Sequence, residues 1–128
     1  MKCDDLFCGI NRPKSLNPDE MSDLEKKHTP VITAPDSVKM GETFEVKVEL
    51  GKYMTHPNEY GHFFQWIEIW LDETFVARFD FTPKASYPDV SVKIAINHAH
   101  EGRAKLKALA FCNLHGLWEN DREIKVEE

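Results

Sequence analysis

The sequence has few cysteines, no excess of positive charge and no long apolar run, and each lack argues against a class of protein. Three cysteines in 128 residues fit a disulfide framework poorly, because the number is odd. Lysine and arginine number 16 against 22 acidic residues, a formal net charge of −6 that disfavours sequence-independent binding of nucleic acid. No segment approaches the roughly 18 apolar residues of a membrane span, and the N-terminus has no apolar core of signal-peptide length. We therefore expect a cytoplasmic protein with mostly reduced cysteines that binds neither nucleic acid nor a membrane.

The length and the local patterns predict one domain preceded by a short arm. With 41% apolar and 30% charged residues, a chain of this size can bury an ordinary core without staples. Residues 1–22 contain turn-forming residues and no sustained hydrophobic period, which predicts an irregular arm. Cys3 and Cys8 lie in this arm and cannot complete a four-thiolate metal site within one chain. Residues 23–128 are expected to form the folded domain.

Alternation of apolar and polar residues predicts that this domain is built from β-strands. In residues 44–50 every second residue is apolar, the period of a half-buried strand. Similar segments, separated by glycine, proline and acidic turn residues, occupy residues 66–71, 75–81, 90–96, 104–112 and 124–126, with short strands near Val31 and Val38. About seven strands at this spacing are typical of an all-β, immunoglobulin-like antiparallel sandwich or barrel.

One predicted strand ends in a pair of metal-binding residue types. Cys112 closes the apolar run, His115 follows three residues later, and Gly116 permits a tight turn before Trp118. Thiolate and imidazole both bind transition metals well, and a turn lets both side chains point at one ion. The pair supplies only half of most metal sites.

Three further histidines are candidates for the other half of the site. His28 precedes Pro30, which predicts a loop or the start of a strand at His28. His56 and His62 lie six residues apart in one loop, residues 51–63. Loops cluster at the ends of a Greek-key sandwich, so these residues can meet the Cys112 turn. We interpret the remaining histidines, His98 and His100, as surface residues.

The number and type of the five candidate ligands separate three metals. A structural zinc site needs four ligands, so a fifth would be surplus. A blue-copper site also lies on a β-sandwich, but it would want a methionine after His115 and would leave histidines unused. Four imidazoles and one thiolate suit square-pyramidal iron with one open position, opposite a thiolate that donates electron density. A blue-copper-like electron-transfer protein and a metal-free immunoglobulin-like binding module remain the alternatives.

Three motifs in order resemble the superoxide reductases, the neelaredoxin and desulfoferrodoxin family. They are Glu-Lys-Lys-His-Thr-Pro at 25–30, Gly-Lys with His-Pro-Asn and a second histidine in 51–62, and Cys-Asn-Leu-His-Gly-Leu-Trp-Glu at 112–119. The resemblance spans about residue 23 to the C-terminus. It implies an immunoglobulin-like fold, in agreement with the strand pattern.

The resemblance also implies the site and the reaction. Residues 23–128 would bind one mononuclear non-haem iron (Fe2+/Fe3+) per chain, through the residues His28, His56, His62, His115 and, as the axial thiolate, Cys112. The enzyme would reduce superoxide by one electron to hydrogen peroxide, which detoxifies it. A rubredoxin or similar electron donor would restore the electron, and the chain would be a homo-oligomer, with a tetramer favoured.

Two residues that precede His28, Lys27 and Glu25, bear on this implied activity. Lys27 matches the family's lysine and would be the catalytic residue that attracts the superoxide anion and holds the water that supplies protons. A family glutamate that ligates ferric iron stands two residues before the histidine, but here that position is Lys26. Glu25 is one residue further away, so it is a candidate ferric ligand that we expect not to bind in the family manner.

Overall fold

The structure is a computed structural model that describes residues 5–128. Two short helices, η1 (Pro18–Glu20) and α1 (Asp23–His28), lie near the N-terminus. The described residues otherwise form strands β1 (Ile10–Asn11), β2 (Val31–Thr33), β3 (Ser37–Lys39), β4 (Thr43–Glu49), β5 (Phe64–Leu71), β6 (Thr74–Asp80), β7 (Asp89–Ala95), β8 (Arg103–Cys112) and β9 (Gly116–Glu127). None of the helices in this part of the chain is long and apolar enough to cross a membrane.

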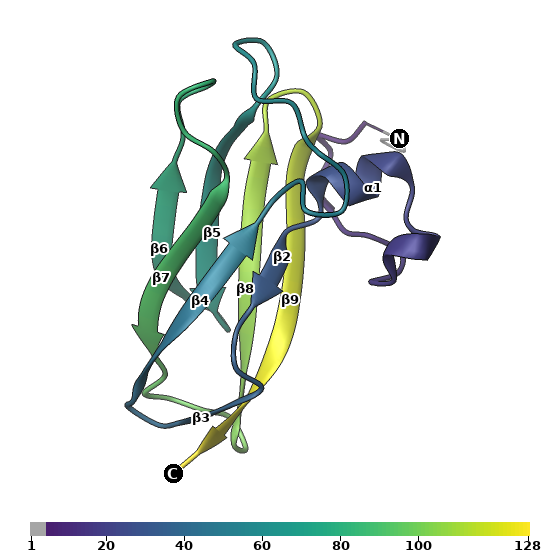
Figure 1. The fold of residues 1–128 in the computed structure, drawn as a ribbon. Coiled ribbons are helices and arrows are strands. Elements are labelled where there is room, and N and C mark those ends of the chain that lie inside the picture. Colours follow the sequence, from purple (N-terminus) through teal and green to yellow (C-terminus); the bar gives the residue numbers. More distant parts are fainter. Residues whose placement is uncertain (1–4) are drawn as a thin grey trace.

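The strands form two sheets that face each other (Figure 1). The larger sheet has the order β1-β9-β8-β5-β6, and β3 pairs with the far end of β9. The smaller sheet has the order β2-β4-β7. The long strands pair antiparallel, whereas β1 and β3 join β9 in parallel. This arrangement confirms the predicted all-β, immunoglobulin-like sandwich.

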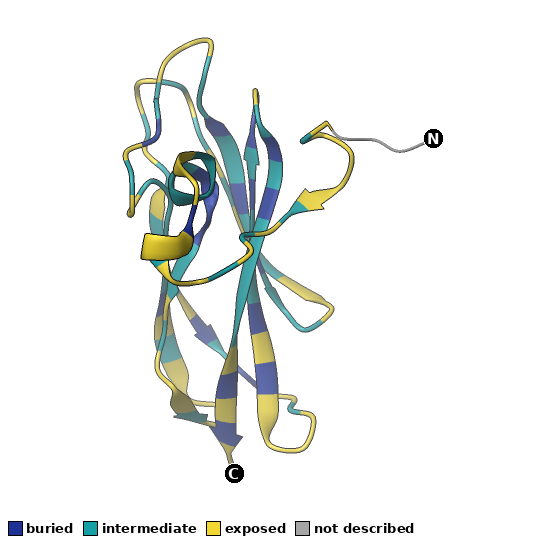
Figure 2. Ribbon diagram, turned by 90° about the vertical axis from the view of Figure 1, so that its right-hand side faces the viewer, coloured by how far each residue is buried: buried dark blue, intermediate teal, exposed yellow. Residues whose placement is uncertain are grey.

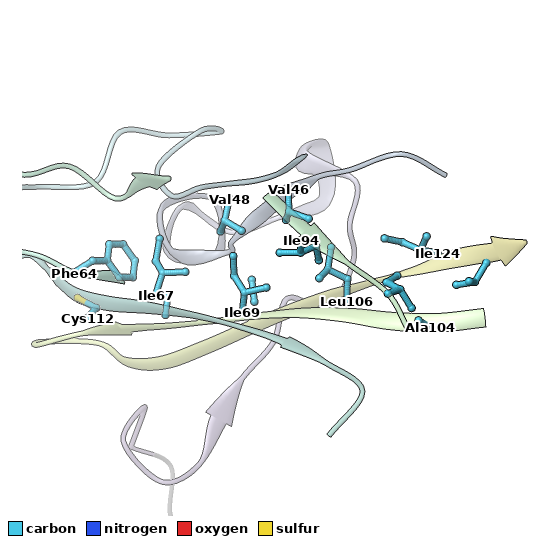
Figure 3. Close-up of a cluster of buried hydrophobic side chains, with 14 residues drawn as sticks. Val46, Val48, Phe64, Ile67, Ile69, Ile94, Ala104, Leu106, Cys112 and Ile124 are labelled. Atoms are coloured by element: carbon cyan, nitrogen blue, oxygen red, sulfur yellow. The ribbon is translucent and has the colours of Figure 1, made fainter. Parts of the chain in front are cut away.

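The core lies between the sheets and follows from the alternation seen in the sequence. In β8 every second residue from Ala104 to Cys112 is buried, and the residues between them face outward. Ile67 and Ile69 of β5 meet Val46 and Val48 of β4 across the gap (Figure 3). Cys112 and Phe64 lie in the same cluster, at one end of it (Figure 3). The Cys112 thiol is therefore part of the core.

Two elements differ from the expectation. His28 is not on a loop or strand but is the last residue of α1. The helix forms because Ser22 and Glu25 make a capping box at its start. In this box the Glu25 N–H donates to the Ser22 hydroxyl, and the Ser22 N–H donates to the Glu25 carboxylate. The last strand begins at Gly116 rather than near residue 124, since it pairs along the whole of β8. The length of β9 is set by its pairing with β8, which the local alternation of residues does not reveal.

The arm is more ordered than its sequence suggests. Phe7 packs edge-on against Phe111, with 6.1 Å between ring centroids, and Asn11 donates to the carbonyls of Leu6 and Leu117. Cys8 is disulfide-bonded, contrary to the expectation of mostly reduced cysteines, and Cys3 lies outside the described residues. The arm thus packs against the start of β9, beside the turn that follows Cys112.

We expect Gly116→Ala to destabilise the protein by about 1–3 kcal/mol, because position 116 requires both a left-handed backbone and empty space. Gly116 has φ +81°, and a Cβ there would lie 2.5 Å from the Leu6 carbonyl oxygen. Chemical denaturation measures the loss. Gly61→Ala is the matched control, since no atom lies within 4 Å of the added methyl group. Equal stability of the two variants would contradict this account of the arm.

Candidate metal centre

Three segments that are far apart in the sequence meet at one end of the sandwich. The C-terminal end of α1 carries His28, the β4–β5 loop carries His56 and His62, and the β8–β9 turn carries Cys112 and His115. Figure 1 shows these three segments at the same end of the molecule. The structure therefore brings together the five residues that the sequence predicted as ligands.

The donor atoms of these residues converge. One donor atom each from His28, His62, Cys112 and His115 lies within 4.8 Å of the others. The Nε2 atom of His56 joins them, at 3.2 Å from the His28 Nε2 and 3.5 Å from the Cys112 Sγ. The His115 Nδ1 atom lies 3.8 Å from the same sulfur. All five donors thus border a single small volume.

The four imidazole rings contact one another in a closed cycle. Ring centroids are 4.7 Å apart for His28 and His56, 4.7 Å for His56 and His62, 5.0 Å for His62 and His115, and 4.8 Å for His115 and His28. In each pair the rings are steeply inclined to one another. The four rings thus surround one shared volume, and the Cys112 sulfur lies close to a nitrogen of two of them.

Hydrogen bonds to the backbone orient the two buried imidazoles. The His28 Nδ1–H donates to the Leu24 carbonyl one turn earlier in α1, at 2.7 Å. The His56 Nδ1–H donates to the Pro57 carbonyl at 2.6 Å. Because each Nδ1 carries its proton, each Nε2 keeps a lone pair directed at the centre. The surrounding backbone therefore selects the tautomer that a metal requires.

Burial keeps these imidazoles neutral. His28 is 1% exposed and His56 9% exposed. Desolvation, with a smaller contribution from repulsion by neighbouring histidines, lowers the pKa of His28 to about 4 and that of His56 to about 3. The hydrogen bonds to the Leu24 and Pro57 carbonyls offset part of this effect. Desolvation also lowers the pKa of His62, with contributions from His115 and from the charge of Lys27. Neutral imidazole is the form that ligates metals.

The Cys112 thiol is buried and receives backbone hydrogen bonds. Desolvation raises the pKa of this thiol, and bonds from the Leu114 and His115 backbone partly offset the rise. A metal ion would replace the thiol proton, and the same backbone N–H groups would then stabilise the thiolate. The Trp118 indole N–H donates to the His115 carbonyl at 2.9 Å, which holds the turn in place.

The residues present fit a transition-metal ion. The His62 Nε2 atom is buried and has no hydrogen-bond partner, and a buried polar atom is rarely left so. Metal coordination would satisfy it. Four imidazoles and a thiolate form a soft-to-borderline donor set, which suits iron, copper or zinc rather than calcium or magnesium.

Two asparagines position the ligand segments, and the sequence did not single them out. Asn113 joins the Cys112 turn to the histidine loop: its amide donates to the Gly61 carbonyl and accepts from the Phe63 N–H, both at 2.9 Å. Asn58 ties the same loop to residues 82–86 through the Lys84 N–H and the Ser86 carbonyl. The sequence signal was their proximity to predicted ligands: Asn113 directly follows Cys112, and Asn58 lies two residues after His56.

The remaining candidates lie as follows. Lys27 is on the last turn of α1 beside His28, and its charge lowers the pKa values of His28 and His62, although less than burial does. Both Glu25 carboxylate oxygens are engaged elsewhere, one by the Ser22 N–H and one by the Lys14 N–H. His98 and His100 are exposed, as expected. The ferric-ligand candidate is thus held at the opposite end of α1.

The metal-free protein should lose stability as the pH falls from about 6.5 toward 4. In the unfolded chain the imidazoles bind a proton near pH 6.5, whereas His28 and His56 in the folded protein resist it until about 4 and 3. The loss is about 1.4 kcal/mol per pH unit for each imidazole. Urea unfolding at pH 7.5 and 5.0 measures it. His56→Asn should weaken the pH dependence of the free energy of unfolding, and His98→Asn should leave it unchanged. Equal stability of the wild-type protein at both pH values would refute the attribution of this dependence to His28 and His56.

Asn113→Ala should cost about 1–3 kcal/mol of stability and weaken metal retention, because the Phe63 N–H and Gly61 carbonyl lose their partner. Thermal unfolding and the rate of metal loss to a chelator measure the two effects. Leu114→Ala is the matched control, since that side chain on the same turn is 50% exposed. Equal metal retention in the two variants would show that Asn113 does not position the ligands.

Comparison with known proteins agrees with this site. The desulfoferrodoxin family model matches residues 20–121. A relative from Methanocaldococcus jannaschii is 42% identical over 121 residues, 94% of this chain and 97% of the relative. A superoxide reductase of Thermococcus kodakarensis is 34% identical over 102 residues, an alignment that covers 75% of this chain and 85% of the relative. A solved superoxide reductase (neelaredoxin) from Ignicoccus hospitalis has a TM-score of 0.77 and 35% identity over 92% of this chain and 95% of that one. With matches of this extent, the chain belongs to the superoxide reductase family.

Proposed function

We propose that this protein is a superoxide reductase, an oxidoreductase that reduces superoxide by one electron to hydrogen peroxide. The observation that carries the proposal is the convergence of four imidazoles and one buried cysteine on one small volume. Relatives over most of the chain are named superoxide reductase, which supports the same reaction. No feature of the site favours the copper alternative, since the cycle of four histidines gives every imidazole a role.

The ligand set of the proposal is His28, His56, His62, His115 and Cys112, and they would hold one mononuclear non-haem iron per chain. Ferrous iron held there would supply the one electron that, with two protons, converts superoxide to hydrogen peroxide. The chain's own groups set the conditions for that transfer. The two backbone-bonded histidines keep their Nε2 lone pairs aimed at the centre, and Cys112 would bind the iron as an electron-donating thiolate.

We assign the capture of substrate to Lys27. Superoxide is an anion and the chain has a net charge of −6, but charges beyond a Debye length of about 8 Å are largely screened. A local cation therefore matters more than the net charge. Lys27 lies on the last turn of the helix that delivers His28, and its charge contributes to lowering the pKa values of His28 and His62. Its ammonium group can attract the anion and hold the water that supplies a proton to the product.

We further propose that Glu25 does not bind the ferric ion in the family manner. Its two carboxylate oxygens accept hydrogen bonds from the Ser22 and Lys14 N–H groups, and these bonds lower its pKa. Moving Glu25 to the metal would break the capping box of α1, which typically contributes about 1 kcal/mol. The position that Glu25 leaves on the ferric ion would then be open or filled by water.

Other parts of the proposal follow from the resemblance. The physiological electron donor would be rubredoxin or a similar protein, and the chain would form a homo-oligomer, with a tetramer favoured. The protein would act in the cytoplasm against oxygen stress. Residues 23–128 would be the iron domain, with residues 1–22 as its arm.

The first experiment is metal analysis together with a visible spectrum before and after oxidation and an assay of superoxide consumption. We expect one iron per chain, a thiolate-to-ferric charge-transfer band on oxidation, and peroxide formation without release of dioxygen. Cys112→Ser should abolish the band. His98→Asn is the control, because that exposed imidazole lies outside the ligand set. Copper with a blue band, or iron without superoxide consumption, would overturn the proposal.

Lys27→Met should lower the second-order rate of superoxide consumption by roughly ten-fold or more, since a local cation raises the rate of anion capture by about 10–10³. The wild-type rate should fall with ionic strength, and the variant's rate should depend on it less. Pulse radiolysis or stopped-flow mixing measures both. Lys26→Met is the matched control on the same helix turn. Equal rates for the two variants would show that Lys27 has no special role.

A further inference from the structure

One aromatic side chain, Trp118 near the start of β9, contacts two histidines of the metal centre that come from different segments. Trp118 is 2% exposed. Its indole ring stacks on the His28 imidazole, with 5.1 Å between ring centroids and 23° between the ring planes. Its indole N–H donates to the His115 carbonyl at 2.9 Å. A single side chain therefore joins the end of α1 to the β8–β9 turn.

The stack with Trp118 fixes the plane of the His28 ring. The hydrogen bond from the His28 Nδ1–H to the Leu24 carbonyl holds one atom of the ring, but by itself it would let the ring swing about that bond. Phe64 also contacts this imidazole, edge-on, with 5.6 Å between centroids. Figure 2 shows that the chain is buried where α1 ends, so the ring has no free space in which to turn. The stack therefore determines where the His28 Nε2 lone pair points.

The hydrogen bond to the His115 carbonyl supports a second ligand in a different way. For His28 and His56 a backbone carbonyl holds the ring itself. For His115 the support from Trp118 acts on the backbone. The His115 Nδ1 atom lies 3.8 Å from the Cys112 sulfur, and Nδ1 is closer along the covalent bonds to the backbone than Nε2 is. A shift of the His115 backbone would therefore move this nitrogen directly.

The turn that carries His115 is anchored at both of its ends. Cys112 of β8 pairs with Gly116 of β9, which closes the turn. Asn113 ties the first residue of the turn to the histidine loop. Trp118 ties the last residue of the turn through the His115 carbonyl. Each of these anchors is a hydrogen-bonding group, so loss of the Trp118 indole would leave the His115 end of the turn with less support.

We propose that Trp118 is a positioning residue that sets the spacing of His28 and His115, which are neighbours in the cycle of imidazoles. Their ring centroids lie 4.8 Å apart. An indole N–H can only donate, so Trp118 supplies no ligand atom and acts through the two histidines. Groups that orient metal ligands typically change metal affinity by about 10–100-fold when they are removed. The inference rests on the metal centre of the proposed function and makes Trp118 a determinant of metal retention and of the reduction potential of the iron.

The test separates the two contacts of Trp118 with two substitutions. Trp118→Phe keeps an aromatic ring beside His28 but loses the N–H, and Trp118→Leu loses both contacts. The rate of iron loss to a chelator should rise by about 10–100-fold in Trp118→Leu and by less in Trp118→Phe. Trp66→Phe and Trp66→Leu are the matched controls, because Trp66 stacks on Phe111 at 5.9 Å rather than on a ligand. Both controls should lose iron at the wild-type rate.

A second readout distinguishes positioning from a general loss of stability. The midpoint reduction potential of the bound iron should change in Trp118→Leu and stay at the wild-type value in Trp66→Leu, and urea unfolding gives the stability of each variant. Wild-type iron loss and potential in both Trp118 variants, or equal changes in Trp66→Leu, would overturn the role. Superoxide consumption is assayed separately. A wild type that holds iron without consuming superoxide would overturn the proposed function and leave the role of Trp118 intact.

Discussion

Withdrawal of the metal-centre side chains from water is the constraint on which the rest of this structure depends. His28, His56 and Cys112 are buried, and His62 and His115 are partly buried. Buried imidazoles resist charging, and those of His28 and His56 do so until pH values of about 4 and 3. The same desolvation is unfavourable unless the lone pairs find a partner. A metal ion would satisfy all five side chains at once, including the otherwise unpaired His62 Nε2 atom.

The architecture holds these side chains in place with ordinary backbone interactions. Helix α1 begins with a capping box and ends at His28, whose ring is bonded to the turn before it and stacked on Trp118. Antiparallel pairing of β5 with β8 fixes the distance between the histidine loop and the cysteine turn, and Asn113 joins them directly. The ligand segments are therefore tied to α1, to the larger sheet and to one another.

The prediction from sequence succeeded where the residue type itself carries the information. The apolar alternation in residues 44–50 and 104–112 indicated strands, and the structure has β4 and β8 there. It missed one element that a local signal indicates and one that depends on a distant partner. The capping box of Ser22 and Glu25 was visible in the sequence, but the proline at position 30 suggested extended structure and the short helix was missed. The full length of β9 depends on its pairing with β8, so the pattern of residues 116–123 alone did not predict a strand.

The sequence by itself determined the chemistry: which residues can bind a metal, in what number, and on a β-sandwich. That information resides in residue types and local periods, which do not depend on distant contacts. Tertiary structure alone decided the cyclic order of the four imidazoles, the nitrogen that each presents, and the engagement of Glu25 at the start of α1. It also decided that Trp66, Phe111 and Leu117 form one outward row. These features arise only when strands pair, because pairing sets which distant side chains become neighbours.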